Sequence, residues 1–174
     1  YTGQYLDIKK IAELGHAKKC MVGIDLAHGA GNIQPNLHDS SIDFAAWCTY
    51  KYLNSGPGSL SGLFVHEKHA QRKDLPRFAG WWNHNKETRF NMRQPFDVME
   101  GAEGWQLSNP PILSMAAIKA SLDIFEKVGM DVLVKKSKKL TGFFEYLVNE
   151  IASDTIEIIT PTNPNERGCQ LSLQ

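Results

Sequence analysis

Three short apolar runs set the strongest limit on how this chain can fold. They cover residues 20–25, 44–49 and 62–65. Each run is too short for a helix, and uninterrupted apolar runs of this length are typical of strands covered on both faces of a sheet. Residues 6–19 precede them with apolar positions at helical spacing among Lys and Glu. Strands interleaved with a helix in this way predict an α/β domain with a mostly parallel sheet.

A long irregular segment and two helical patterns follow the third run. Residues 76–111 show no period and are rich in Trp, Asn, Gly and Arg, which is typical of a functional loop region. Apolar spacing predicts helices over residues 112–128 and about 130–151, and alternation predicts strands over 155–160 and 169–174. We therefore divide the chain into residues 1–128, part of a large α/β domain, and residues 129–174, part of a smaller α+β domain. Because the last strand stops before any turn signal and the chain starts without Met, we expect a central-to-C-terminal fragment of a longer protein.

Charge and cysteine content narrow the classes of partner and compartment. The 19 Lys and Arg residues balance 19 Asp and Glu residues, so no net field favours nucleic acid or an anionic membrane. No apolar run approaches the length of a transmembrane helix, and no basic region followed by an apolar stretch begins the chain. The three cysteines are an odd number in apolar surroundings, typical of reduced, buried thiols in a cytoplasmic protein.

Asp25 and Lys51 stand where a parallel sheet gathers its ligands. Asp25 ends the first apolar run, and Lys51 lies between the second run and a turn rich in Gly and Ser. Their separation allows one crossover connection, which would put both residues at the carboxyl ends of neighbouring strands. A carboxylate that keeps a pyridine nitrogen protonated and a neutral amine that forms a Schiff base are the two groups a pyridoxal phosphate site requires.

Plainer interpretations of the same residues stay open at this point. Asp25 would equally cap the turn that follows it, His28 would equally be an ordinary loop histidine, and a single lysine is usually solvated. His66 and His69 stand three residues apart rather than the four of a zinc-binding helix, and no third ligand is evident. We expect a solvated turn there and no metal site.

Four short motifs, taken together, resemble one family of pyridoxal-phosphate enzymes. They are Asp25-Leu-Ala-His28, Trp47-Cys-Thr-Tyr-Lys-Tyr-Leu-Asn54, Gly80-Trp81 and Ser108-Asn-Pro-Pro111. The chain closely resembles kynureninases over essentially all 174 residues, with Thr49 where the family has Ser. The resemblance implies an aspartate-aminotransferase-like fold of fold type I and a homodimer. It also implies hydrolysis of kynurenine or 3-hydroxykynurenine to anthranilate or 3-hydroxyanthranilate plus alanine, in tryptophan catabolism and NAD biosynthesis.

The resemblance assigns roles to four residues around the expected strand ends. Lys51 would be the Schiff-base lysine, which also abstracts the substrate's α-proton, and Asp25 would be the partner of the pyridine nitrogen. His28 would contact the cofactor and the substrate. Tyr50 would reach the cofactor phosphate and would donate the proton that completes alanine.

The resemblance also implies parts of the site that come from a second subunit or from segments outside these 174 residues. Trp81 and Asn109 match residues that complete the site from the other subunit, and Asn109 would also touch the substrate. The family's remaining phosphate ligands and the arginine for the substrate carboxylate would precede Tyr1 and follow Gln174. The resemblance therefore implies that this segment alone is inactive.

Two competing interpretations remain. Cysteine desulfurases share the fold and the strand-end Asp and Lys, but they carry His directly before the lysine, where this chain has Tyr50. They also need a cysteine on a mobile loop, and none of the three cysteines falls in such a loop by pattern. The other interpretation is a folded, non-catalytic fragment that acts only as an interaction module.

Overall fold

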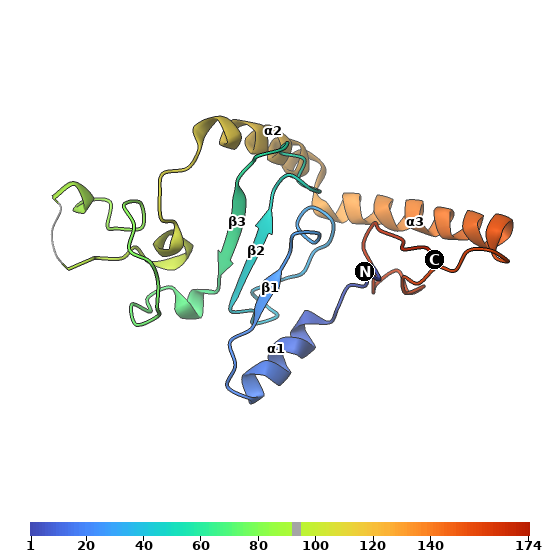
Figure 1. Cartoon of the computed structure of the whole chain (residues 1–174), viewed down its shortest axis with the longest axis horizontal. Helices are drawn as coiled ribbons and strands as arrows, with labels where there is room; N and C mark the ends of the chain where they lie inside the picture. The colour runs from blue at the N-terminus through green and yellow to red at the C-terminus, as the bar shows by residue number, and fades with distance from the viewer. Residues whose placement is uncertain (92–94) are drawn as a thin grey trace.

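A small mixed sheet stands at the centre of the chain (Figure 1). The computed structural model describes residues 1–91 and 95–174. Strands β1 (Gly23–Asp25), β2 (Phe44–Cys48) and β3 (Ser61–Val65) lie in the order β1-β2-β3. The pair β1 and β2 is parallel, whereas β2 and β3 are antiparallel. The predicted α/β class is confirmed, but the described sheet is mixed rather than mostly parallel, because residues 49–60 form a direct turn instead of a crossover.

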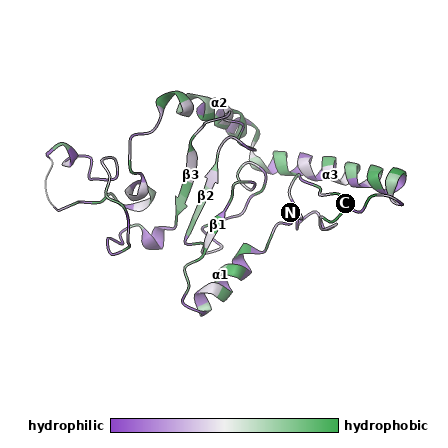
Figure 2. Ribbon diagram, viewed as in Figure 1, coloured by the Kyte–Doolittle hydropathy of each residue, from purple (hydrophilic) through white to green (hydrophobic). Residues whose placement is uncertain are grey.

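Helix α1 (Ile8–Ala17) packs its apolar side against the start of β1. The Asp7 side chain accepts a hydrogen bond of 2.9 Å from the Lys10 N–H, and this N-cap explains why the helix begins later than the pattern predicts. Apolar and polar positions alternate along α1 in Figure 2. Ile8 joins Val22 and Ile42 in the buried core cluster, so the core lies at the end of the sheet where β1 and β2 begin.

Two long helices and an irregular lobe complete the architecture. Helices α2 (Ile112–Val128) and α3 (Met130–Ala152) meet at Gly129, which has a φ of 82° that favours glycine. The bounds predicted for both helices agree with the structure. Within residues 66–91 and 95–111, the structure has three short 3₁₀ turns, η1 (Glu67–His69), η2 (Arg89–Asn91) and η3 (Gly101–Trp105). This irregular lobe lies at the opposite end of the molecule from α3 (Figure 1). Among the described residues, no helix has the length and apolar character needed to cross a membrane.

The last twenty residues are hydrogen-bonded to the first residues of the chain. The strands predicted over 155–160 and 169–174 pair antiparallel, but only through a bridge between Ile158 and Leu173 and a few flanking hydrogen bonds. Ser172 Oγ donates to the Tyr1 carbonyl at 2.7 Å, and Thr160 Oγ1 donates to the Thr2 carbonyl at 2.7 Å. The two chain ends therefore lie side by side (Figure 1).

The strands and the cysteines are more exposed than the sequence predicts. The strands are not covered on both faces within the described residues, because Phe44 is 45% exposed and Leu63 is 41% exposed. Nor are the cysteines buried: Cys20 and Cys169 are exposed, Cys48 is half-buried, and all three are free. Cys20 follows the end of α1 in a turn, and Cys169 lies in the terminal segment, so neither belongs to the core that an apolar sequence context suggested.

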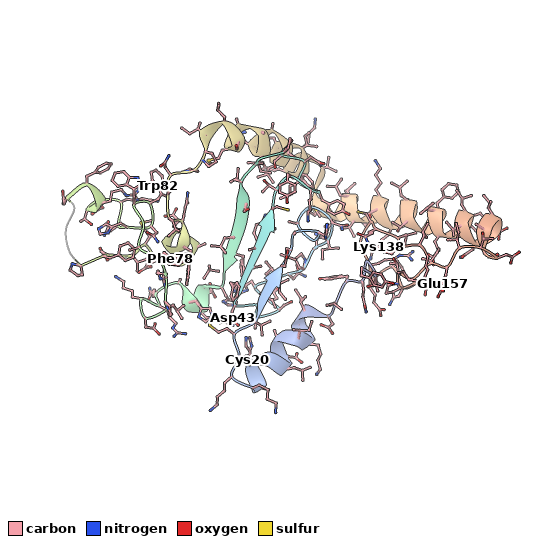
Figure 3. All side chains as sticks on the ribbon, in the orientation of Figure 1. Cys20, Asp43, Phe78, Trp82, Lys138 and Glu157 are labelled. Atoms are coloured by element: carbon pink, nitrogen blue, oxygen red, sulfur yellow. The ribbon has the colours of Figure 1, made fainter. Side chains whose placement is uncertain are left out.

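Asp43 is a buried anion at the start of β2, beside α1 (Figure 3). One carboxylate oxygen, Oδ2, accepts hydrogen bonds from the Val22 N–H at 2.6 Å and from His16 Nε2 at 2.9 Å. Oδ1 lies 2.7 Å from both His69 Nε2 and Lys68 Nζ. Burial alone would raise the pKa of Asp43, but the hydrogen bonds from Lys68, His69, the Val22 N–H and His16 together hold it well below its ordinary value.

The motif His66 to His69 is therefore not the solvated turn that its sequence suggested. His66 is buried, and its Nδ1 accepts a hydrogen bond of 3.1 Å from the Lys68 N–H. His69 is drawn inward by Asp43, a partner twenty-six positions earlier that the local pattern did not reveal. No group of three or more His, Cys, Asp or Glu residues in the described part of the chain is arranged to hold a metal ion.

Asp43→Asn should lower the free energy of unfolding by about 3 kcal/mol at pH 7, because it leaves Lys68 without its buried partner. Since the pKa of Asp43 is lower in the folded state, the carboxylate contributes fully above its unfolded pKa of about 3.9, and the contribution is lost as the pH falls below that value. Urea denaturation from pH 7 to pH 2 should show the difference between the two proteins begin to shrink near pH 4 and continue to shrink toward pH 2. Asp39→Asn is the control, since that side chain is 85% exposed and should change stability by less than about 0.5 kcal/mol.

Candidate active site

The turn after β1 presents Asp25 and His28. Asp25 Oδ1 accepts a hydrogen bond of 2.7 Å from the Ala27 N–H, so Asp25 does cap the turn that follows it. The N–H groups of Gly29 and Ala30 both donate to the Leu26 carbonyl, which curls the backbone beneath His28. The hydrogen bonds of Asp25 to described residues use Oδ1, which leaves Oδ2 for a ligand.

Lys51 lies in a tight loop that is fixed at its base and from one side. Thr49 is buried beneath the loop, and its hydroxyl accepts a hydrogen bond of 2.7 Å from Ser55 Oγ. From α2, Ser121 Oγ donates to the Leu53 carbonyl at 2.6 Å. The half-buried Lys51 therefore projects from a loop with little freedom to move.

A cleft of about 600 Å³ brings the predicted charged residues together. Asp25, His28 and Lys51 all line it, and its volume is within the range of small-molecule sites. The prediction that Asp25 and Lys51 follow neighbouring parallel strands is confirmed by the β1–β2 pairing. The cleft thus offers an amine, a carboxylate and an imidazole to one ligand.

Gly31 permits the two loops to approach each other. Its φ is 82°, and a Cβ at this position would lie 2.9 Å from the Tyr52 carbonyl oxygen and 3.0 Å from Leu53 Cδ2. Any side chain at Gly31 would push against backbone atoms one residue away from Lys51. The distance between the loop of Lys51 and the turn of His28 therefore depends on this glycine.

Gly31→Ala should lower the free energy of unfolding by about 3 kcal/mol, because backbone strain and the clash with Tyr52 add together. Gly58→Ala is a matched control: Gly58 has a φ of 74°, yet no atom lies within 4 Å of the added Cβ. The control should cost only the strain of about 1 to 2 kcal/mol. Chemical denaturation of both variants measures the difference, and equal losses would contradict the close approach.

Tyr50 lies beside the cleft rather than in its wall. It is 51% exposed and absent from the residues that line the cleft. A hydrogen bond with the Cys48 thiol raises the pKa of Tyr50 above its ordinary value. The phenol therefore remains protonated at neutral pH.

Trp81 and Asn109 are also not brought to this cleft. Trp81 is 46% exposed and meets the Phe90 ring edge-on, with centroids 4.9 Å apart. Its neighbour Trp82 lies in the irregular lobe, across the sheet from β1 (Figure 3). Asn109 is exposed ahead of α2. Both exposed side chains can thus contact the surface of another protein chain.

One wall of the cleft has no signal in the local sequence. Gly168 and Gln170, from the terminal segment, line it together with residues near Tyr1. These positions are more than a hundred residues from Lys51, and no local pattern marks them. The signal exists only in the folded chain, where the terminal segment meets the turn after β1.

Comparison with known proteins identifies the family. A sequence model of class-V aminotransferases matches residues 1–173. The chain belongs to the aminotransferase class-V family. Within this family, a kynureninase from Myxococcus xanthus is 56% identical over 173 residues, and one from Flavobacterium psychrophilum is 55% identical over 176 residues. Each match takes in 99% of this chain and 41% of the relative, so the chain spans about two fifths of the length of these relatives.

Solved structures place the class-V aminotransferase chain in fold type I. A cysteine desulfurase from Escherichia coli superposes with a TM-score of 0.73 at 15% identity, covering 99% of this chain and 40% of that one. An alanine–glyoxylate aminotransferase from Nostoc sp. gives 0.65 at 18% identity, covering 99% and 43%. These identities show a shared fold, and the predicted fold type is confirmed.

Proposed function

We propose that these 174 residues form part of a kynureninase, a cytoplasmic enzyme that hydrolyses the Cβ–Cγ bond of kynurenine or 3-hydroxykynurenine. The observation that carries the proposal is that Lys51, Asp25 and His28 line the same cleft. The kynureninase names of relatives at 53–56% identity support the substrate class. The products would be anthranilate or 3-hydroxyanthranilate and alanine.

The groups in the cleft fit pyridoxal 5'-phosphate. The Lys51 amine would hold the cofactor aldehyde, the Asp25 carboxylate would pair with the ring nitrogen, and His28 would contact the cofactor and the substrate. A cleft of about 600 Å³ has room for the cofactor and an amino acid. When bound, the cofactor supplies an electron sink for charge that develops beside the substrate amine.

Lys51 and Asp25 in the cleft, and Tyr50 beside it, would hold and transfer protons during the reaction. Lys51 would accept the α-proton of the substrate, because its amine is the base nearest the attachment point. Asp25, oriented by the Ala27 N–H, would hold a proton on the ring nitrogen. Tyr50, which remains protonated, would contact the cofactor phosphate and give a proton to the carbon that becomes the methyl group of alanine.

The direct test uses a chain of kynureninase length that contains these residues. We expect it to bind pyridoxal phosphate, seen as visible absorbance, and to release anthranilate or 3-hydroxyanthranilate with equimolar alanine. Sulfide release from cysteine would instead support a cysteine desulfurase, although the chain offers Cys169 in a neighbouring cavity rather than in the cleft. Absence of cofactor binding would favour an interaction module and contradict the proposal.

The proposal includes a homodimer whose two sites are shared. Trp81 is 46% exposed, Asn109 is exposed, and neither lines the cleft of its own chain. Both would complete the cleft of a second copy, where Asn109 would also contact the substrate. Residues 1–128 would belong to the cofactor-binding domain and residues 129–174 to the smaller domain. The 174 residues alone would be inactive, because the remaining phosphate ligands and the carboxylate-binding arginine would come from other segments.

Mixing two impaired variants should restore part of the activity if the sites are shared. Lys51→Ala and Trp81→Ala dimers would each be impaired, the latter about thirtyfold or more. In a mixed dimer, one cleft would have an intact Lys51 and receive an intact Trp81 from its partner. Random mixing would then recover roughly a quarter of the wild-type sites. No recovery after denaturation and joint refolding, with mixed dimers verified by mass, would contradict a shared site.

A further inference from the structure

Asn32 joins two segments that lie far apart in sequence. Its Nδ2 donates to the His28 carbonyl at 3.0 Å, and its Oδ1 accepts from the Cys169 N–H at 2.9 Å. The first bond belongs to the turn that presents His28, and the second belongs to the terminal segment. A single half-buried amide therefore connects both walls of the cleft.

The backbone opposite Asn32 is adapted to this contact. A Cβ at Gly168 would stand 2.7 Å from both Asn32 Oδ1 and Nδ2, which is closer than real Cβ atoms approach. Gly168 has no positive φ to explain its identity. Room for the Asn32 amide is thus the structural reason for glycine at this position.

The same segment lies beside Tyr52. Burial and the neighbouring Cys169 thiol raise the pKa of Tyr52 to about 12. Tyr52 and Cys169 line a neighbouring cavity of about 410 Å³ against α3, and Asn32 lines both this cavity and the cleft. Asn32 thus stands in the partition between the two spaces.

We infer that Asn32 is a positioning residue that holds Gly168–Gln170 against the His28 turn and so keeps this wall of the cleft in place for substrate binding. This inference rests on the proposed function. Lys51 and Asp25 are fixed by their own loops and do not depend on Asn32. Loss of the amide should therefore weaken substrate binding while leaving the cofactor attached.

The test uses the kynureninase-length protein with cofactor bound. Asn32→Ala removes both hydrogen bonds, each of which has a modest net strength. We expect the KM for kynurenine to rise about tenfold or more, with kcat within about threefold of wild type. Amide hydrogen exchange at residues 168–170 should also accelerate about tenfold or more, since the Cys169 N–H loses its acceptor.

Gly168→Ala is a second variant that disrupts the contact with Asn32, this time from the terminal segment. Its Cβ should displace the Asn32 amide and raise KM similarly, but it should have no further effect once Asn32 is alanine. Gly142→Ala is the control, because nothing lies within 4 Å of its added Cβ in α3, and it should leave KM and exchange unchanged.

The outcomes separate the inference from the proposed function. Faster exchange with a raised KM in both single variants, and no added effect in the double variant, would support the role of Asn32. An unchanged KM or unchanged exchange, or effects that multiply in the double variant, would overturn it while wild-type turnover left the proposed function standing. A wild-type protein that binds no pyridoxal phosphate would overturn the proposed function and, with it, the role inferred for Asn32.

Discussion

Lys51→Ala should abolish covalent attachment of pyridoxal phosphate and lower kcat by about 10³-fold or more. Lys51 is the lysine that lines the cleft with Asp25 and His28, and alanine leaves no amine there to hold the cofactor aldehyde or accept a proton. The loop itself should persist, because Thr49, Ser55 and Ser121 fix it without using the lysine side chain. Loss of activity would then reflect chemistry and not unfolding.

Borohydride reduction followed by peptide mass spectrometry measures the attachment directly. Wild type should carry the cofactor mass on the peptide that contains Lys51, and the variant should carry none there. Lys119→Ala is the control: its side chain is 74% exposed and pairs with Asp123 on α2, so the variant should match wild type. A reducible adduct that persists at stoichiometric level in Lys51→Ala would remove Lys51 from the proposed role.

Local patterns were sufficient for the parts of the fold that local interactions determine. The helices over 112–128 and from 130 were predicted with nearly their observed bounds, because proline before the first and Gly129 between them leave little choice. The neighbouring strand ends that bear Asp25 and precede Lys51 followed from two apolar runs and one connection of suitable length. The motifs around them also led to the right family, since class-V aminotransferases match nearly the whole chain.

The features that the sequence could not predict depend on contacts between residues far apart in the chain. His69 reads as part of a polar turn until Asp43, across the sheet end, draws it inward. The direction of β3 depends on whether residues 49–60 form a turn or a crossover, and apolar periodicity is the same in both cases. The reason for glycine at position 168 is visible only in the folded chain, where Gly168 lies against Asn32, 136 positions earlier, in the wall of the cleft.

Asp25→Ala should lower kcat by about 10²- to 10³-fold while the cofactor stays attached to Lys51, which differs from the effect of Lys51→Ala. Alanine removes the charge that would keep the ring nitrogen protonated, and it also removes the cap on the Ala27 N–H. Asp25→Asn keeps an acceptor for that N–H without the charge. If the charge is what matters, both variants should lose activity alike, whereas a purely structural cap would be preserved by Asn.

A cofactor methylated on its ring nitrogen offers a sharper test, because its positive charge is permanent. In Asp25→Ala the methyl group has the space of the missing carboxylate, so this analogue should raise kcat about tenfold or more over the natural cofactor. In wild type the same methyl group would meet the Asp25 carboxylate and should lower activity. Opposite responses of the two proteins would assign Asp25 to the ring nitrogen. Equal responses would leave the turn cap on Ala27 as the role of this carboxylate, and the electron sink would need another anion.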